Sequence, residues 1–588
     1  MLSDIDSANN LVELFLKRAD EKGDFPFLGA KREGEWQTIS WREAADRVCL
    51  LAEGLRGLGL RDGDRVCLVS ENRPEWCIAD LAIMAAGCIT VPAYITNTER
   101  DHVHILDNSG AKAVIVSTEK LLRPLHGALQ ASGVAEHVIG IEDLHRQQSG
   151  SFSFHKWDRM LEGDPAAARK AVDTRIAGIS RSDTACIIYT SGTGGAPRGV
   201  LQHHGAILCN SAGAAEILIE DFGIDQDERF LSFLPLSHAY EHTGGQFLPI
   251  GVGAQIYYAE GLEKLASNIE ETRPTIMVVV PRLFEVLRTR IMKQIRKQGG
   301  IAETLMDTAL EVGERRAAGE RKLGDGVKEF AVARLLKPKI RQRFGGRIKA
   351  MVSGGAPLNP EVGIFFEAMG LTMLQGYGQT EAGPVISCNR PAAGIAMHSV
   401  GPAMRGVEIR IAEDGEILVR GELVMHGYWQ NESETERTIK DGWLHTGDIG
   451  HLDDQGRIVI TDRKKDIIVN SGGENIAPGR VEALLTIEPE IEQVMVDGDK
   501  RPWLSAVIVP SEELRNIATS PDALYTMVGE AVDRANSRLS QLERVRRFLI
   551  ADEAFTIDNG QMTATLKVRR HIVRDIYGER LDELYPQK

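Results

Sequence analysis

The sequence predicts an α/β protein with a large N-terminal part and a smaller C-terminal part. Three observations lead to this fold class. Short apolar runs alternate with helix-length stretches through the first half of the chain, which is typical of parallel βα sheets. Short strands and turns dominate residues 401–462, and a mixed α+β pattern follows Lys465. With 588 residues, the chain is long enough for several domain-sized units.

The predicted elements follow one another along the chain at βα spacing. Apolar side chains at helical spacing predict helices over residues 11–19 and 76–86. Short apolar runs predict buried strands at residues 66–69, 113–116, 138–141 and 185–189. Residues 286–347 are rich in charge at helical spacing, which predicts a helical excursion with solvated faces. Further strands are predicted at residues 407–411, 416–419, 457–460, 493–496 and 506–509.

Composition and charge exclude several classes of protein. Hydrophobic residues make up 43% and charged residues 26%, which is ordinary for a globular chain and unlike a disordered one. The net charge of −15 repels nucleic acid and anionic lipid, although a local basic patch can still hold a phosphorylated small molecule. Seven cysteines, an odd number without metal-ligand spacing, are typical of a reduced cytosolic protein.

No segment predicts secretion or membrane insertion. The acidic start lacks the basic and apolar regions of a signal peptide. The most apolar window, residues 77–95, contains Asp80, Gly87 and Pro92 and is too polar and broken to span a bilayer. We therefore expect a cytoplasmic protein without a transmembrane segment. Peripheral contact with the inner face of a membrane and homo-oligomerisation both stay open.

A glycine-rich loop follows the strand predicted at residues 185–189. Over residues 189–200 it reads YTSGTGGAPRGV. Glycines let the backbone approach a ligand closely, and successive N–H groups and hydroxyls cradle phosphate oxygens. Arg198 adds a positive charge. The loop therefore predicts a phosphate site, with a plain tight loop as the alternative.

Two common phosphate motifs do not fit this loop. A Walker A loop requires Lys and then Ser or Thr directly after its second glycine, whereas Val200 and Leu201 follow Gly199. A dinucleotide fingerprint requires G-x-G-x-x-G, whereas Pro197 occupies the third glycine position. The loop is therefore a phosphate loop of another kind.

Five further motifs follow the loop. They are SGGAPL at residues 353–358, GYGQTE at 376–381, GWLHTGD at 442–448, DRKKD at 462–466 and MTATLKVRR at 562–570. Tyr377 offers a flat face for stacking, Thr380 a hydroxyl group, and Glu381 a hard carboxylate oxygen that suits Mg²⁺. The carboxylate of Asp448 accepts two hydrogen bonds at once. Taken singly, each motif is better explained as a surface turn or a solvated charge run.

Together the six motifs resemble the adenylate-forming superfamily, which includes acyl-CoA synthetases, firefly luciferase and peptide-synthetase adenylation domains. The superfamily's loop is close to YTSGTTGxPKGV. This chain has Gly194 in place of the second threonine of that loop and Arg198 in place of its lysine. Arg198 keeps the positive charge with a different geometry. With the N-terminal βα region, the resemblance covers nearly the whole chain.

The resemblance assigns a role to each motif. It implies an adenylation domain at residues 1–464, with a β-rich subdomain at about 385–462, and a small mobile domain at 465–588, with Lys465 as the hinge. Asp448 and Arg463 are expected at the ribose, Glu381 at Mg²⁺, and Lys567 with Arg198, Thr380 and Glu381 in catalysis. The resemblance implies these further nucleotide contacts: Thr190, Ser191, Gly192, Thr193, Gly194, Gly195, Gly355, Ala356, Pro357, Gly376, Tyr377, Gly378 and Thr380.

The resemblance also implies a two-step reaction. ATP converts a carboxylate into an acyl adenylate, and a thiol, that of CoA, then attacks it. The chain looks most like long-chain fatty acyl-CoA synthetases, on the basis of LPLSH at residues 234–238, VPRLFE at 280–285, the helical insertion and TLK at 565–567. His238 is expected to border the acyl carbonyl, with a structural histidine as the alternative. The predicted partners are fatty acid, ATP and CoA, without nucleic acid.

A basic set is expected to meet the CoA phosphates, with ordinary surface as the alternative: Arg544, Arg546, Arg547, Arg569 and Arg570. Two other functions stay open. A fatty acyl-AMP ligase or acyl-acyl-carrier-protein synthetase performs the same first step with another acceptor. A nucleotide-binding scaffold performs no chemistry, and the intact Glu381, Asp448 and Lys567 disfavour it.

Overall fold

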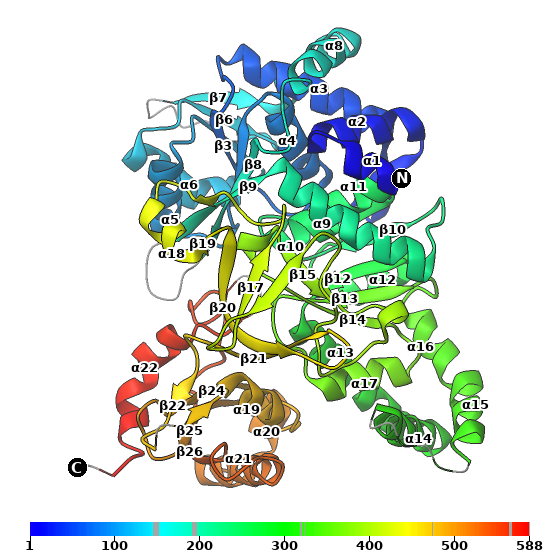
Figure 1. The fold of residues 1–588 in the computed structure, drawn as a ribbon, viewed down its shortest axis with the longest axis vertical. Helices are drawn as coiled ribbons and strands as arrows, with labels where there is room; N and C mark the ends of the chain where they lie inside the picture. Colours follow the sequence, from blue (N-terminus) through cyan, green and yellow to red (C-terminus); the bar gives the residue numbers. More distant parts are fainter. Residues whose placement is uncertain are drawn as a thin grey trace.

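Two eight-stranded sheets form the body of the N-terminal part (Figure 1). The computed structural model describes residues 1–144, 152–190, 197–317, 320, 322, 324–472, 474–563 and 567–586. The first sheet has the order β15 (Val385–Cys388), β14 (Met373–Gly378), β13 (Ala350–Ser353), β12 (Ile276–Val279), β10 (Arg229–Ser232), β11 (Gln255–Tyr258), β1 (Pro26–Arg32) and β2 (Glu35–Ser40). Its edge strands β2 and β15 are antiparallel to their neighbours, and the rest are parallel.

The second sheet is built in the same way. Its order is β18 (Gly427–Tyr428), β9 (Arg198–His203), β8 (Thr184–Thr190), β4 (Ile89–Pro92), β3 (Arg65–Val69), β5 (Ala113–Val116), β6 (His137–Gly140) and β7 (Ser153–Lys156). Only β9 and β18 run antiparallel to their neighbours. The strands predicted at residues 66–69, 113–116, 138–141 and 185–189 are confirmed as β3, β5, β6 and β8.

A buried helix lies between the two sheets. Every residue of α4 (Pro74–Ala85) is buried, and the helix contacts β1 of the first sheet and β3 and β4 of the second. The first part of the apolar window, residues 77–85, is therefore a core helix, which is mostly apolar because both of its sides are covered. Among the described residues, no helix is long and apolar enough to cross a membrane. The helix predicted at residues 11–19 is confirmed as α2 (Leu11–Lys22).

A small antiparallel sheet follows the first large sheet. It contains β16 (Glu408–Ile411), β17 (Glu416–Arg420), β19 (Ile439–Lys440), β20 (Trp443–Leu452) and β21 (Ile458–Arg463). Ile417, Leu444 and Ile458 of this sheet share a buried cluster with Tyr377 of β14. This packing fixes the small sheet against the strand that carries the third motif. The segment at residues 385–388, placed by the sequence in the β-rich part, pairs instead with β14 as strand β15.

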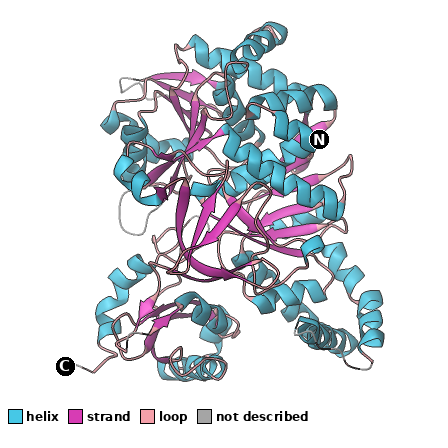
Figure 2. Ribbon diagram, viewed as in Figure 1, coloured by secondary structure: helices cyan, strands magenta, loops and turns pink. Residues whose placement is uncertain are grey.

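The chain after Lys465 has a core of its own. It contains a two-stranded ribbon, β22 (Ile468–Val469) with β23 (Asn475–Ile476), and a three-stranded sheet, β24 (Ile491–Asp497), β25 (Leu504–Pro510) and β26 (Val545–Ile550). Helices α19 (Pro478–Leu485), α21 (Pro521–Asn536) and α22 (Arg570–Asp582) pack around them. Two hydrophobic clusters lie wholly within this segment. The alternation of helices and strands in this part is visible in Figure 2.

The described residues between 281 and 343 form a helical arm, where the sequence predicted a helical excursion over residues 286–347. The arm consists of α13 (Pro281–Gln298), α14 (Gly300–Ala317), α15 (Asp325–Leu335) and α16 (Lys337–Arg343). Its inner side chains, such as Met306, Val332 and Ile340, join a buried cluster with Phe365 and Phe366 of α17 (Pro360–Ala368). The arm therefore packs against the N-terminal body on one side and meets solvent on the other.

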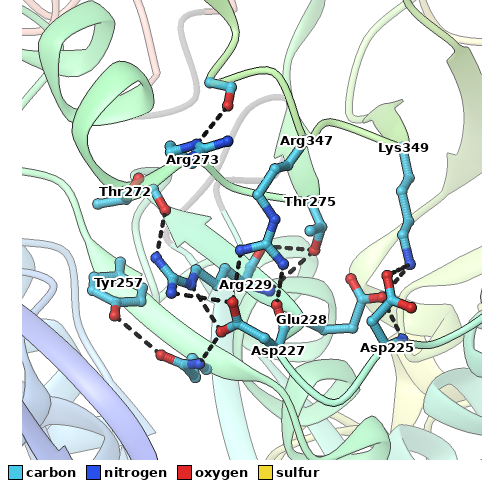
Figure 3. Close-up of polar contacts among 12 residues, drawn as sticks. Asp225, Asp227, Glu228, Arg229, Tyr257, Thr272, Arg273, Thr275, Arg347 and Lys349 are labelled. Carbon is cyan, nitrogen blue, oxygen red and sulfur yellow. Dashed lines mark hydrogen bonds and ion pairs between the residues drawn. The ribbon is translucent and has the colours of Figure 1, made fainter.

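An ion-pair network fixes the return of the arm to the first sheet (Figure 3). Arg347 donates from Nη1 to the carboxylate of Asp227 at 2.8 Å and from Nη2 to its backbone carbonyl at 2.7 Å. Arg229 donates to the same carboxylate at 3.0 Å, and Lys349 pairs with the buried Glu228. Burial alone would raise the pKa of Asp227, but the two arginines hold it below its usual value.

Candidate active site

A cavity of about 2100 Å³ lies where both large sheets, the small sheet and the C-terminal segment meet. The predicted residues on its wall are Thr190, Arg198, His238, Gly355, Gly376, Tyr377, Gly378, Thr380, Glu381, Arg463, Lys465 and Lys567. Asp448 lies behind this wall, and Ala356 and Pro357 do not line it. Ser191, Gly192, Thr193, Gly194 and Gly195 lie outside the described residues.

The sheet topology explains why distant motifs meet here. Strands β13 and β14 are parallel neighbours, so the turn at Gly355 and the strand end at Gly378 lie at one edge of the first sheet. In the second sheet β8 and β9 are antiparallel, and Thr190 pairs with Arg198. The two ends of the glycine-rich loop are therefore held side by side and face the same cavity.

Asp448 connects the third motif to Arg463, two residues before Lys465. Its Oδ2 accepts a hydrogen bond from the hydroxyl of Tyr377 at 2.6 Å, and its Oδ1 accepts one from Nε of Arg463 at 2.9 Å. Only 4% of Asp448 is exposed, and β20 and β21 place it directly opposite Arg463. Each carboxylate oxygen keeps a second lone pair for a further donor. Burial, then the charge of Asp448, raises the pKa of Tyr377 well above its usual value, so this hydroxyl stays a neutral donor.

Several polar and charged side chains lie around Glu381, the predicted metal ligand. The hydroxyl of Tyr428 donates to Oε1 of Glu381 at 2.8 Å, and the guanidinium of Arg198 lies 4.6 Å from the centre of the Tyr428 ring. Arg198 also forms an ion pair with Glu434 of α18 (Glu432–Thr438). Neither Tyr428 nor Glu434 was predicted from the sequence, because their place depends on the pairing of β18 with β9.

Lys567 reaches this cavity from the C-terminal segment. An antiparallel bridge joins Met562 to Val568, the residue directly after Lys567. Burial lowers the pKa of Lys567 to about 8, and the positive charge of Arg463 adds to this effect, against the opposite effect of Asp448. The amine is thus a cation near pH 7 that is easily neutralised at higher pH.

His238 lies on the same wall as Lys567. Burial, followed by the charge of Lys567, lowers the pKa of His238 to about 4, so the ring is neutral at pH 7. Its Nδ1 accepts a hydrogen bond from the backbone N–H of Tyr240 at 3.2 Å. The single proton of the neutral ring therefore sits on Nε2, which makes this atom a donor.

The donor set fits Mg²⁺ at one position. Glu381 supplies a hard carboxylate oxygen on the cavity wall. Over the described part of the chain, no three His, Cys, Asp or Glu side chains gather into a metal site. Glu381 together with phosphate oxygens and water would therefore supply the oxygen ligands that Mg²⁺ prefers.

Basic side chains gather where the C-terminal segment borders the cavity. Those on the wall are Lys464, Lys465, Lys500, Arg501, Arg569, Arg570 and Arg574. Of the five arginines proposed for CoA phosphates, Arg569 and Arg570 belong to this set, while Arg544, Arg546 and Arg547 do not line the cavity. Arg570 also pairs with Glu482. Lys500 and Arg501 lie in a turn between β24 and β25, so sequence spacing did not indicate them.

Comparisons with known proteins identify the family of this chain. The model of the AMP-binding enzyme family matches residues 15–429, and that of the AMP-binding enzyme C-terminal domain matches residues 465–588. A long-chain-fatty-acid–CoA ligase of Mycobacterium tuberculosis is 32% identical, over 98% of this chain and 97% of that protein. A chloroplastic long-chain-fatty-acid–acyl-carrier-protein ligase of Arabidopsis thaliana is 30% identical, over 97% and 89%.

A solved structure shares the fold. The A domain of the carboxylic acid reductase from Segniliparus rugosus, in complex with AMP and a co-purified carboxylic acid, superposes with a TM-score of 0.77. The match covers 99% of this chain and 95% of that one at 20% identity. The family models and the relatives together show that this chain belongs to the AMP-binding enzyme family.

Proposed function

We propose that this protein uses ATP to convert a long-chain fatty acid to acyl-AMP and then transfers the acyl group to CoA. The similarity to long-chain-fatty-acid–CoA ligases over almost the whole chain supports the substrate class. The observation that carries the chemistry is the position of Lys567, which shares one cavity with the glycine-rich loop flanks, Glu381 and His238. This position supports a site in which Lys567 acts as a cation, Glu381 as a metal ligand and His238 as a hydrogen-bond donor toward a carboxylate and a triphosphate.

In the first step, a carboxylate oxygen of the fatty acid attacks the α-phosphorus of ATP, and pyrophosphate leaves with the electron pair of the broken P–O bond. Two anions approach each other, so the site must supply positive charge. We assign Lys567 to the carboxylate and α-phosphate oxygens and Arg198 to the departing phosphates. Thr380 donates its hydroxyl to the α-phosphate, and Nε2 of His238 faces the acyl carbonyl. Mg²⁺ held by Glu381 would neutralise phosphate charge.

Binding of the nucleotide depends on the third to fifth motifs. We assign Tyr377 to the adenine face, with the backbone of Gly355 and Gly376 beside it. Asp448 would accept the ribose hydroxyls through its remaining lone pairs, held in place by Arg463. Because Tyr377 and Arg463 already fix the carboxylate, ribose binding requires no reorientation of Asp448.

In the second step, the sulfur of CoA attacks the acyl carbonyl, the thiol proton is released, and AMP leaves. This step needs access to the carbonyl that Lys567 covers in the first step. We infer that a domain of residues 465–588 rotates about Lys465 relative to a domain of residues 1–464. The separate core of the C-terminal segment supports this division, since it can move as a unit. Lys500, Arg501, Arg569 and Arg574 are then candidates for the CoA phosphates.

Pyrophosphate release tests the proposal. Purified protein is incubated with ATP, Mg²⁺ and fatty acids of increasing chain length, with and without CoA, and products are separated by mass. We expect release for long-chain acids and an acyl-CoA product when CoA is present. Absence of release with every acid would overturn the proposal and favour a nucleotide-binding scaffold.

A second acceptor has specific support, because a relative of similar identity is an acyl-carrier-protein ligase. We propose acyl transfer to a carrier-protein thiol as the alternative second step. Acyl adenylate that accumulates with CoA but is consumed by a phosphopantetheinylated carrier protein would favour this alternative.

A membrane surface is the expected source of the substrate, because long-chain fatty acids partition into bilayers. We therefore include peripheral membrane contact by a cytoplasmic enzyme in the proposal. Self-association is compatible with it, and sedimentation equilibrium would measure it.

A further inference from the structure

We propose that helix α15 docks this protein on an anionic lipid bilayer, with Val327, Phe330 and Leu335 inserted among the lipid headgroups. The inference rests on the membrane contact in the proposed function and names the surface that makes it. It does not depend on the chemistry in the cavity, which other elements build.

The outer face of α15 exposes large apolar side chains. Phe330 is 68% exposed, Val327 76% and Leu335 52%. The opposite face is packed, since Val332 and Leu336 are buried in the cluster below the arm. The helix is thus held firmly by its inner face, and its outer face is apolar where a solvated helix would carry polar residues.

Positive charge predominates on α15 and on α16, which follows it, whereas α14, which also packs against α15, carries acidic residues such as Glu311. Helices α15 and α16 carry six Lys and Arg residues against two Asp and Glu residues. One of the acids, Asp325, is buried and paired with Arg315 at 2.6 Å. Among the described residues, no ion-pair partner occurs for five of these six cations: Arg334, Lys337, Lys339, Arg341 and Arg343. Arg334 lies seven residues after Val327 and hence on the same face.

The positive charge of α15 and α16 indicates that an anionic surface binds to the outer face of α15. The whole chain carries −15, so an anionic surface repels most of the molecule and attracts this face, which would orient the protein on it. A helix with apolar side chains on one face and basic flanks binds at the headgroup region of anionic membranes. Figure 1 shows α15 at the outer edge of the molecule, on the side away from the C-terminal domain, where a flat bilayer has access.

A second copy of the chain fits the surface less well. A stable dimer buries roughly 800 Å² on each partner, and each large side chain supplies at most about 250 Å². Three side chains on one short helix therefore fall short of a dimer interface. Insertion into lipid headgroups needs no such complementary surface.

Cosedimentation with vesicles tests the proposal. The full-length protein is mixed with vesicles of phosphatidylcholine alone and of phosphatidylcholine with about one third phosphatidylglycerol. The variants are Phe330→Glu and the double variant Arg334→Ala/Lys339→Ala. Ile517→Glu serves as the matched control, because Ile517 is 60% exposed but lies on α20 (Glu512–Ile517) in the C-terminal domain.

We expect binding to the anionic vesicles only. The partition coefficient should fall at least tenfold for Phe330→Glu and about fivefold for each charge removed, while Ile517→Glu binds as the wild type does. No binding, equal binding to neutral vesicles, or equal effects of Phe330→Glu and Ile517→Glu would overturn the proposal. A wild-type dimer that dissociates in the Phe330→Glu variant would also overturn the proposal, because a second copy of the chain would then cover the outer face of α15.

Catalysis provides an independent measurement on the same variants. Pyrophosphate release from detergent-dispersed fatty acid should be the same for all of them, since α15 does not line the cavity. If the wild type releases no pyrophosphate, the proposed function is refuted, but the vesicle result still supports the docking surface. Normal release without vesicle binding would refute the docking surface alone.

Discussion

Replacement of Lys567 by alanine should separate the two half-reactions. Burial lowers the pKa of this amine from 10.5 to about 8. One pKa unit corresponds to about 1.4 kcal/mol. Because the amine borders a cavity that solvent can enter, we reduce the full value, and charging the amine then costs roughly 2–3 kcal/mol in the ligand-free protein. Carboxylate and phosphate oxygens would offset that cost in the first step. Loss of such a preorganised donor typically slows a reaction roughly 100- to 1000-fold.

The assay measures each half-reaction alone. ATP–pyrophosphate exchange with a fatty acid reports the first step, and conversion of supplied acyl adenylate with CoA reports the second. We expect Lys567→Ala to show the large loss in the exchange reaction only. The control Lys170→Ala should show no loss, because Lys170 on α8 (Pro165–Ile176) is exposed and does not line the cavity. Equal losses of Lys567→Ala in both half-reactions would refute the assignment.

The lowered pKa adds a pH test of the same residue. Lys567 must be protonated to act, so kcat/KM for exchange should be maximal below pH 8 and fall as pH rises through about 8. Lys567→Arg keeps its charge at these pH values and should lose this alkaline decline, whatever its absolute rate. If the alkaline decline is unchanged in Lys567→Arg, a group other than Lys567 causes the decline.

Three further outcomes test other parts of the structure. Asp448→Asn should raise the KM for ATP about tenfold, because one acceptor for ribose is lost, and leave the KM for fatty acid unchanged; an unaltered ATP titration would contradict the ribose contact. Glu434→Gln frees Arg198 from a competing anion and should lower the KM for ATP about fivefold; a rise would show that Glu434 positions Arg198. Arg347→Ala should lower the free energy of unfolding in urea by about 1 kcal/mol by removing two hydrogen bonds of the network in Figure 3, and an unchanged midpoint would contradict this.

Local patterns predicted much of the fold and the site. The apolar runs at β3, β5, β6 and β8 identified buried strands because such strands need apolar side chains on both faces. The motifs around Tyr377, Glu381 and Asp448 predicted nucleotide chemistry only through their joint resemblance to the adenylate-forming superfamily. Each of these signals lies within a few consecutive residues.

Other features exist only because distant segments meet. Arg198 and Glu434 are 236 residues apart, and their ion pair depends on the pairing of β18 with β9. The helical pattern of α15 was visible in the sequence, but the packing of the arm decided that Val332 is buried and Phe330 is exposed.

By itself, the sequence determined which chemical groups this protein has and which short segments hold them. Only the tertiary structure decided that Lys567 lies beside Arg463 and His238, and hence that its pKa falls to about 8. The reason is that a pKa depends on solvent exclusion and on charges brought close in space, and neither of these is encoded in the local spacing of residues.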